Sequence, residues 1–343
     1  MDRRSFLGQA SVAALAAGLP TAAFAAASGK PADQKLRTLL DTIFNDRLTQ
    51  SPEGATRLGL DTGKNAALKS QLSGRSAADA AKDLARSRQE LASIKEIGRT
   101  GLGEDAALDY DVVTYQLERS IAGQQTFTYG SSGGRFAPYL ISQLSGAYQD
   151  VPDFLDTQHR VNDAADADAY VARLGAFAEV LDQETERQSA DAARGVFAPD
   201  YILDTTLKQF AALRDKPAAE TGLVTGFAAK LAKAGLPADR AAEAAKIVAG
   251  KVFPALDRQR ALVTELRGKA THEAGVWRLP DGDAYYASAA EAATTVRLSG
   301  DEIHRMGLDQ VAEISGRIDG ILKAQGMTPV SYTHLTLPTI YSV

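Results

Sequence analysis

The sequence of 343 residues contains no cysteine. The chain therefore forms no disulfide, and it offers neither a thiolate metal ligand nor a cysteine nucleophile. Histidine is also scarce, with four in the whole chain. A zinc site would have to be built from these imidazoles together with carboxylates.

No strong excess of charge of either sign is present. The 38 basic and 43 acidic residues give a net charge of −5 without a basic stripe, which argues against a nucleic-acid partner. The sequence lacks a Gly-x-Ser-x-Gly elbow and a glycine-rich loop between a strand and a helix. Neither a serine hydrolase of that type nor a phosphate-binding loop is indicated. No apolar run after residue 27 reaches the length of a membrane span.

The first 27 residues have the pattern of an export signal. Arg3 and Arg4 precede a short run rich in alanine and leucine, and Ala-Phe-Ala at residues 23–25 offers small residues for signal peptidase. A basic start, a short apolar middle and an A-x-A end indicate a secretory signal. Paired arginines favour the twin-arginine (Tat) route. We expect residues 1–27 to be removed, the Tat export machinery to be a partner, and the mature chain to be periplasmic.

The other end of the chain reads as translated library adapter. Residues 330–339, Val-Ser-Tyr-Thr-His-Leu-Thr-Leu-Pro-Thr, match in frame the DNA used in transposon-based library preparation, and a final valine precedes the stop as in that adapter. The alternative is a natural threonine-rich tail. We expect residues 329–343 to be adapter-derived and residues 28–328 to be a truncated native domain.

Helical periodicity dominates the native part. Apolar residues recur at three- and four-residue steps, and prolines or capping residues stand at several starts. Ser299 and Glu302 have the spacing of a capping box, and Gly195 is expected to end a helix as a left-handed cap. We expect an all-α fold, one large multi-helix domain with few or no strands, and a kink at Pro254. Residues 136–144 form either a short strand or a short helix. The expected helices span residues 36–48, 76–97, 104–125, 164–193, 199–213, 217–234, 237–267 and 299–324.

Three histidines outside the tail are weak candidates for chemistry. His272 and Glu273 begin a His-Glu-x-x-His pattern, but the fifth residue is Val276. That motif needs two imidazoles one helical turn apart, so a surface pair is the better interpretation. His304 lies in the first turn of the last helix and either faces a cleft or is exposed. His159, in a polar loop region, is interpreted as structural.

The least ordinary segment is residues 275–286. It contains the only tryptophan, a Pro-Asp-Gly-Asp turn and the pair Tyr285 and Tyr286 leading into a helix. Adjacent residues on a helix point about a hundred degrees apart, so at most one tyrosine faces a given cleft. Two interpretations stay open: a phenol that hydrogen-bonds a substrate, and a loop held by aromatic packing.

Several blocks resemble one bacterial family. These are residues 51–60, 109–111, 275–286 and 302–304, and they are similar to the exported domain-of-unknown-function 885 proteins. That family resembles helical zinc metallopeptidases of the His-Glu class and runs to roughly twice this length. Its presumed metal-binding stretch, a His-Glu pair followed by Pro-Gly-His-His, has no counterpart here.

The resemblance implies a function for the longer parent rather than for this chain. It implies a periplasmic zinc peptidase with a peptide substrate, and an inactive N-terminal fragment with no catalytic residue, metal ligand or cofactor of its own. Tyr285, Tyr286 and His304 become walls of the substrate cleft. The alternative is a non-catalytic helical binding or scaffold protein. Truncation would also uncover the apolar side of the last helix, including Val311, Ile314, Ile318 and Leu322, and so favour aggregation.

Overall fold

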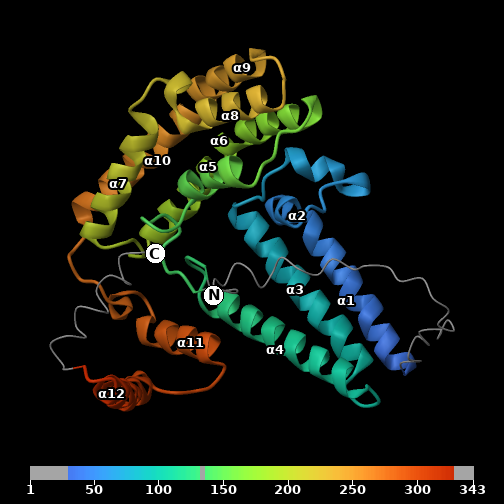
Figure 1. The fold of residues 1–343 in the computed structure, drawn as a ribbon, viewed down its shortest axis with the longest axis vertical. Helices are drawn as coiled ribbons and strands as arrows, with labels where there is room; N and C mark the ends of the chain where they lie inside the picture. Colours follow the sequence, from blue (N-terminus) through green and yellow to red (C-terminus); the bar gives the residue numbers. More distant parts are fainter. Residues whose placement is uncertain (1–29, 132–135, 328–343) are drawn as a thin grey trace.

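The computed structural model describes residues 30–131 and 136–327. The described residues form twelve α-helices and no strand, which confirms the all-α prediction (Figure 1). None of the described helices is both long and apolar enough to cross a membrane. The predicted signal peptide, including Arg3 and Arg4, and the predicted adapter segment 329–343 lie outside the described residues.

The first part of the fold is built by α1 (Pro31–Thr49), α3 (Ala77–Ile97) and α4 (Glu104–Thr126), which lie side by side (Figure 1). Between α1 and α3 the chain forms the short helices α2 (Pro52–Leu58) and η2 (Gly63–Ser70). Helix α3 starts with a reciprocal capping box between Ser76 and Asp79. The three long helices enclose a small core that contains Leu36, Ile94, Leu102, Ala107 and Leu117.

The larger core lies among the helices from α5 to α10 (Figure 1). Helix α6 is central to it and packs on both α5 and α10. Its fully buried residues include Leu174, Phe177 and Leu181. The helices are α5 (Ala147–Thr157), α6 (Ala164–Ala192), α7 (Asp200–Arg214), η3 (Ala218–Glu220), α8 (Gly222–Lys233), α9 (Asp239–Ile247), η4 (Val248–Val252) and α10 (Phe253–Lys269).

The long helix predicted over residues 237–267 is divided. A π-helical turn, η4, separates α9 from α10, and Pro254 lies in the first turn of α10. Proline has no N–H and its ring crowds the carbonyl four residues earlier, so a widened turn before it relieves both problems. The interruption predicted at Pro254 is therefore real, but it takes the form of a π turn just upstream.

Two predictions about irregular segments need correction. Residues 136–144 form neither a strand nor a helix, and carry only two isolated bridges, Ser131 to Ala137 and Ser142 to Ser145. The region before His159, interpreted as a polar loop, contains helix α5 with Pro152 inside it. By contrast, Gly195 ends α6 with a φ of 80°, as predicted for a left-handed cap.

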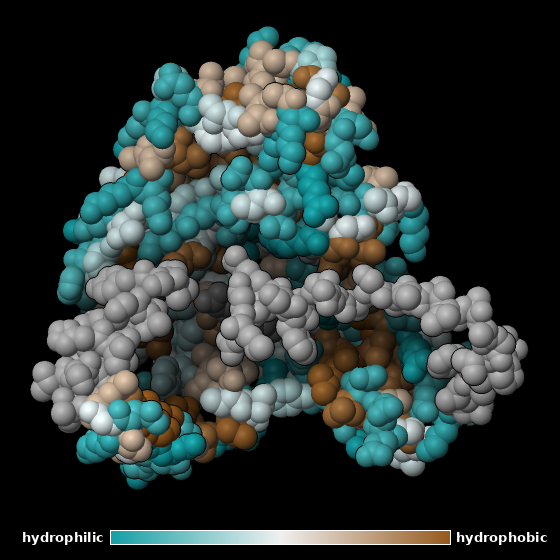
Figure 2. Space-filling view, in the orientation of Figure 1, coloured by the Kyte–Doolittle hydropathy of each residue, from teal (hydrophilic) through white to brown (hydrophobic). Residues whose placement is uncertain are grey.

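The last two helices stand apart from the large core. A short turn, η5 (Val276–Arg278), leads into α11 (Gly282–Thr294), and α12 (Gly300–Ala324) begins with the predicted Ser299–Glu302 capping box. No residue of α12 is buried. Val311, Ile314 and Ile318 are 63%, 52% and 48% exposed, and Leu322 is half-buried. Part of this stripe is visible as brown surface at the lower left of Figure 2.

Candidate functional site

A cleft of about 760 Å³ lies between the first three long helices and the chain that follows α4. Its volume is within the range of ligand-binding sites in proteins. On α3 the lining includes Ala77, Ala80, Ala81 and Leu84, and the segment 127–131, Leu140 and Arg187 line the cleft as well. Arg47 and Arg86 also line it. Of the described residues that line the cleft, Asp83 is the one carboxylate.

The cleft segment, residues 127–131, is fixed from behind by α6 and the turn after it. The buried carboxylate of Asp191 accepts a hydrogen bond from the Gly130 N–H at 2.9 Å. The Arg194 guanidinium donates to the Thr128 carbonyl at 2.9 Å. Gly130 has a φ of +57°, and a Cβ there would lie 2.5 Å from the Ala137 carbonyl oxygen. The turn therefore requires glycine, and the segment has a defined conformation.

The three arginines of the cleft differ in how their charge is neutralised. Arg47 makes a forked pair with Glu90, with Nε at 3.0 Å from Oε1 and Nη2 at 2.5 Å from Oε2. Arg86 bonds Asp83 at 2.9 Å. Arg187 donates to two carbonyls, of Arg75 at 3.4 Å and of Gly130 at 3.2 Å, and makes no salt bridge with any described carboxylate. Arg187 is thus the cation of this cleft that carries uncompensated charge.

Tyr285 supports the cleft segment from the side away from the cavity. Its ring is 2% exposed and stacks on Tyr129 with centroids 5.6 Å apart. The edges of Phe127 and Phe136 complete this aromatic cluster. The Tyr285 hydroxyl donates to the Ser131 carbonyl at 3.3 Å. Burial raises the pKa of the Tyr285 phenol well above its ordinary value.

Tyr286 and His304 lie elsewhere, and neither lines the cleft. Tyr286 is 51% exposed. A Cβ on Gly300 would lie 3.2 Å from Cε1 of Tyr286, so this ring rests against the start of α12. His304 is exposed one turn further along α12. The structure therefore separates the two tyrosines, as their adjacency on a helix predicts, and does not gather the three predicted residues around one cavity.

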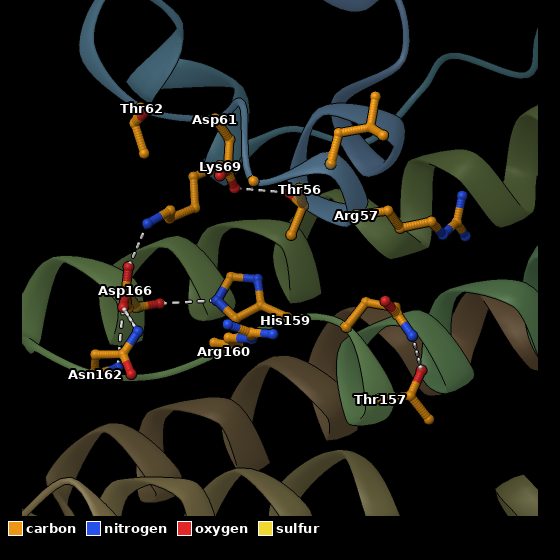
Figure 3. A pocket seen from close by; sticks show the side chains of 13 residues that line it. Thr56, Arg57, Asp61, Thr62, Lys69, Thr157, His159, Arg160, Asn162 and Asp166 are labelled. Carbon is orange, nitrogen blue, oxygen red and sulfur yellow. Dashed lines mark hydrogen bonds and ion pairs between the residues drawn. The ribbon is translucent and has the colours of Figure 1, made fainter. Parts of the chain in front are cut away.

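A second, polar pocket of about 460 Å³ lies between α2, η2 and the turn that connects α5 to α6 (Figure 3). Several of its polar groups pair with one another. Lys69 forms a 2.6 Å ion pair with Asp166, and Thr56 donates to Asp61 at 2.8 Å. His159 lies at its base, with Nε2 3.0 Å from the Asp166 carbonyl oxygen.

Behind this pocket Arg173 is fully buried. Its guanidinium donates to the carbonyls of Gln71 at 2.8 Å and Leu68 at 3.1 Å, and to Thr56 Oγ1 at 2.7 Å. Burial lowers the pKa of Arg173 to about 10, so the side chain stays charged near neutral pH. The arginine thereby fastens residues 52–71 to α6. It was not recognised in the sequence, because a charged residue in a helix is normally solvated.

No group of three or more His, Cys, Asp or Glu side chains that could hold a metal ion exists among residues 30–131 and 136–327. The His272–Glu273 pair is at the surface. His272 Nδ1 is 2.9 Å from Asp200 Oδ1, and Glu273 accepts from the Trp277 indole at 2.5 Å. The described donors therefore do not fit a catalytic zinc site, which needs three protein ligands around one ion.

Comparison with solved structures finds a similar fold that covers most of the chain. The crystal structure of the "putative lipoprotein from Colwellia psychrerythraea" is similar with a TM-score of 0.75 and 25% sequence identity. The similarity covers 86% of this chain and 52% of that chain, so this chain spans about half the length of the solved relative. No curated protein matches.

A family match covers residues 52–337. It extends into the segment 329–343, whose adapter origin therefore stays a prediction. The matched region contains every helix from α2 onward as well as the cleft segment and the Tyr285 cluster. The chain belongs to the family of bacterial proteins of unknown function named DUF885.

Proposed function

We propose that this chain is the helical, substrate-binding portion of a longer exported zinc peptidase. The observation that supports a longer parent is the coverage of the solved relative, and the peptidase assignment rests on the resemblance of the family to helical zinc metallopeptidases. Nearly all of this chain, 86%, corresponds to 52% of that protein. The remaining length of such a protein is where we place the metal ligands and the general base.

The contribution of this chain is to bind and orient a peptide. The cleft beside α3 has the volume of a ligand site, and both the backbone segment 127–131 and an apolar stripe of α3 line it. No step of hydrolysis is assigned to the described residues, because their donors do not form a metal site. Tyr285 acts in this proposal by positioning the cleft segment. Tyr286 on α11 and His304 on α12, both exposed, contact parts of the substrate that extend beyond the cleft.

The experiment is to amplify the gene from genomic DNA, express the uninterrupted product and purify it by gel filtration. We expect about one zinc per molecule by elemental mass spectrometry and hydrolysis of an unstructured peptide mixture that a chelator abolishes. The chain of 343 residues, prepared in parallel, should hold no stoichiometric zinc and cleave nothing. Zinc-independent binding without hydrolysis by the uninterrupted product would instead establish a non-catalytic binding protein.

We also propose that the protein is exported through the Tat pathway to the periplasm. The support is the Arg3–Arg4 pair ahead of a short apolar run. Replacing both arginines with lysine should retain the protein in the cytoplasm, since the Tat system reads the arginine pair. Continued export of the double variant would contradict this route.

A further inference from the structure

The cleft beside α3 combines an apolar wall with one cation that lacks an acidic partner. Ala77, Ala80, Ala81 and Leu84 recur at helical spacing, so they form one stripe along α3. The Arg187 guanidinium lines the same cleft and donates to the carbonyls of Gly130 and Arg75, the latter just before α3. Two carbonyls use only part of its five-donor capacity.

The charge of Arg187 indicates that the ligand of this cleft carries a carboxylate. The carboxylates nearest the other two arginines are already engaged, Glu90 by Arg47 and Asp83 by Arg86. Arg187 has no such partner among the described residues. The two carbonyls accept from the terminal nitrogens Nη1 and Nη2, and each of these nitrogens carries a second N–H. A guanidinium held in this way pairs favourably with a carboxylate, because it is already oriented and little side-chain entropy is lost.

We infer that this cleft binds the carboxyl-terminal residues of a peptide, with the terminal carboxylate on Arg187 and the preceding side chains against the α3 stripe. The inference deepens the proposed function and rests on it for the choice of a peptide ligand. A glutamate or aspartate side chain offers the same carboxylate chemistry, so the test separates these two sources.

The test is binding of three dansyl-labelled tripeptides to the full chain by fluorescence anisotropy. The probes are Ala-Leu-Phe with a free carboxylate, the same peptide as its amide, and Ala-Glu-Phe amide. We expect the free acid to bind at least tenfold more tightly than either amide. Stronger binding of the glutamate peptide would overturn the terminal-carboxylate assignment, and equal binding of all three, or of none, would overturn the site.

Two variants test whether Arg187 causes the preference for a free terminal carboxylate. Arg187→Gln should reduce affinity for the free acid at least tenfold and leave amide binding unchanged. Arg88→Gln is the matched control. It also removes one positive charge, but at an exposed position of α3 that does not line the cleft, so it should have little effect on binding. If both variants weaken binding equally, the preference is a general field effect and the inference fails.

Arg187→Gln also removes a hydrogen bond to the cleft segment, at the Gly130 carbonyl, so a second variant is needed. Leu84→Glu adds a negative charge on the α3 stripe of the cleft and leaves the Arg187 contacts in place. It should weaken binding of the free acid more than that of the amide, and equal weakening would overturn the inference. Because these assays measure binding, they can fail while the uninterrupted protein holds zinc and cleaves peptides, and they can succeed if it does neither.

Discussion

Arg173 and His159 form a buried hydrogen bond, with Nη1 of the arginine 2.8 Å from Nδ1 of the histidine. Because the guanidinium is a donor only, Nδ1 is the acceptor and the proton of the neutral ring lies on Nε2. That N–H donates to the Asp166 carbonyl. A single tautomer of neutral histidine therefore satisfies both neighbours.

This arrangement predicts a loss of stability in acid. Burial, with the nearby charges of Arg173 and Lys230, lowers the pKa of His159 from 6.5 to about 4, although the Asp166 backbone and carboxylate act in the opposite direction. The unfolded chain therefore binds more protons than the folded chain between these two values. Keeping His159 neutral therefore contributes to the free energy of unfolding. This contribution is complete above pH 6.5 and is lost as the pH falls towards 4, a change of about 3 kcal/mol.

Urea unfolding at a series of pH values measures this contribution. His159→Gln keeps a donor and an acceptor but takes up no proton, so its unfolding free energy should depend less on pH across the same range. The difference between the two proteins removes the effect of other titrating groups. Parallel pH profiles would contradict the prediction.

Removing the buried guanidinium should be costly at any pH. Arg173→Met leaves the carbonyls of Leu68 and Gln71 and the ring of His159 without their donor. We expect the free energy of unfolding to fall by about 3 kcal/mol or more, because buried acceptors lose their partners. Arg258→Met is the matched control, since its pair with Asp182 is exposed and is worth less than about 1 kcal/mol. Similar losses in the two variants would show that Arg173 does not fasten residues 52–71 to α6.

Local sequence signals predicted the helices well but did not predict the cleft. The capping box of Ser299 and Glu302 and the cap at Gly195 lie within a few residues of the ends they define, so each can be read from a short window. The cleft brings Leu84 and Arg187 together across a hundred residues of sequence. No periodicity encodes that pairing, because it depends on how two groups of helices pack.

Helix α5 was missed although its sequence contained a usable signal. Tyr148, Val151, Phe154 and Leu155 are all buried and follow helical spacing. Pro152 and the flanking polar residues suggested a loop. Pro152 is the sixth residue of α5, beyond the four N–H groups that have no partner within the helix, so it removes one helical hydrogen bond, whereas four large apolar side chains of α5 are buried. The apolar spacing should therefore have outweighed the proline.

The two adjacent tyrosines should differ sharply in their effect on folding. Tyr285→Ala opens a cavity inside the aromatic cluster, and the free energy of unfolding should fall by about 3 to 5 kcal/mol, as for other large aromatic truncations. Tyr286→Ala, at a residue 51% exposed, should change it by less than about 1 kcal/mol. Urea titrations followed by circular dichroism measure both. If the two variants lost equal free energy of unfolding, the conclusion that Tyr285, and not Tyr286, packs against the cleft segment would be wrong.

The exposed stripe of α12 predicts self-association of this chain. Val311, Ile314 and Ile318 are each about half exposed or more, and no described element covers them. Contiguous apolar surface of this kind promotes association. Light scattering after gel filtration should show a mass that rises with concentration. Ile314→Lys should reduce this association and change the free energy of unfolding by no more than about 0.5 kcal/mol, because the residue is more than half exposed.

Ala312→Lys is the matched control for α12, because it adds the same charge on the opposite side of the helix. It should leave association unchanged if the stripe, rather than net charge, drives it. A wild-type chain that stays monomeric over a wide concentration range and unfolds in one sharp step would contradict the prediction. Equal improvement by both lysines would assign the association to charge, and the apolar face of α12 would then need no covering partner.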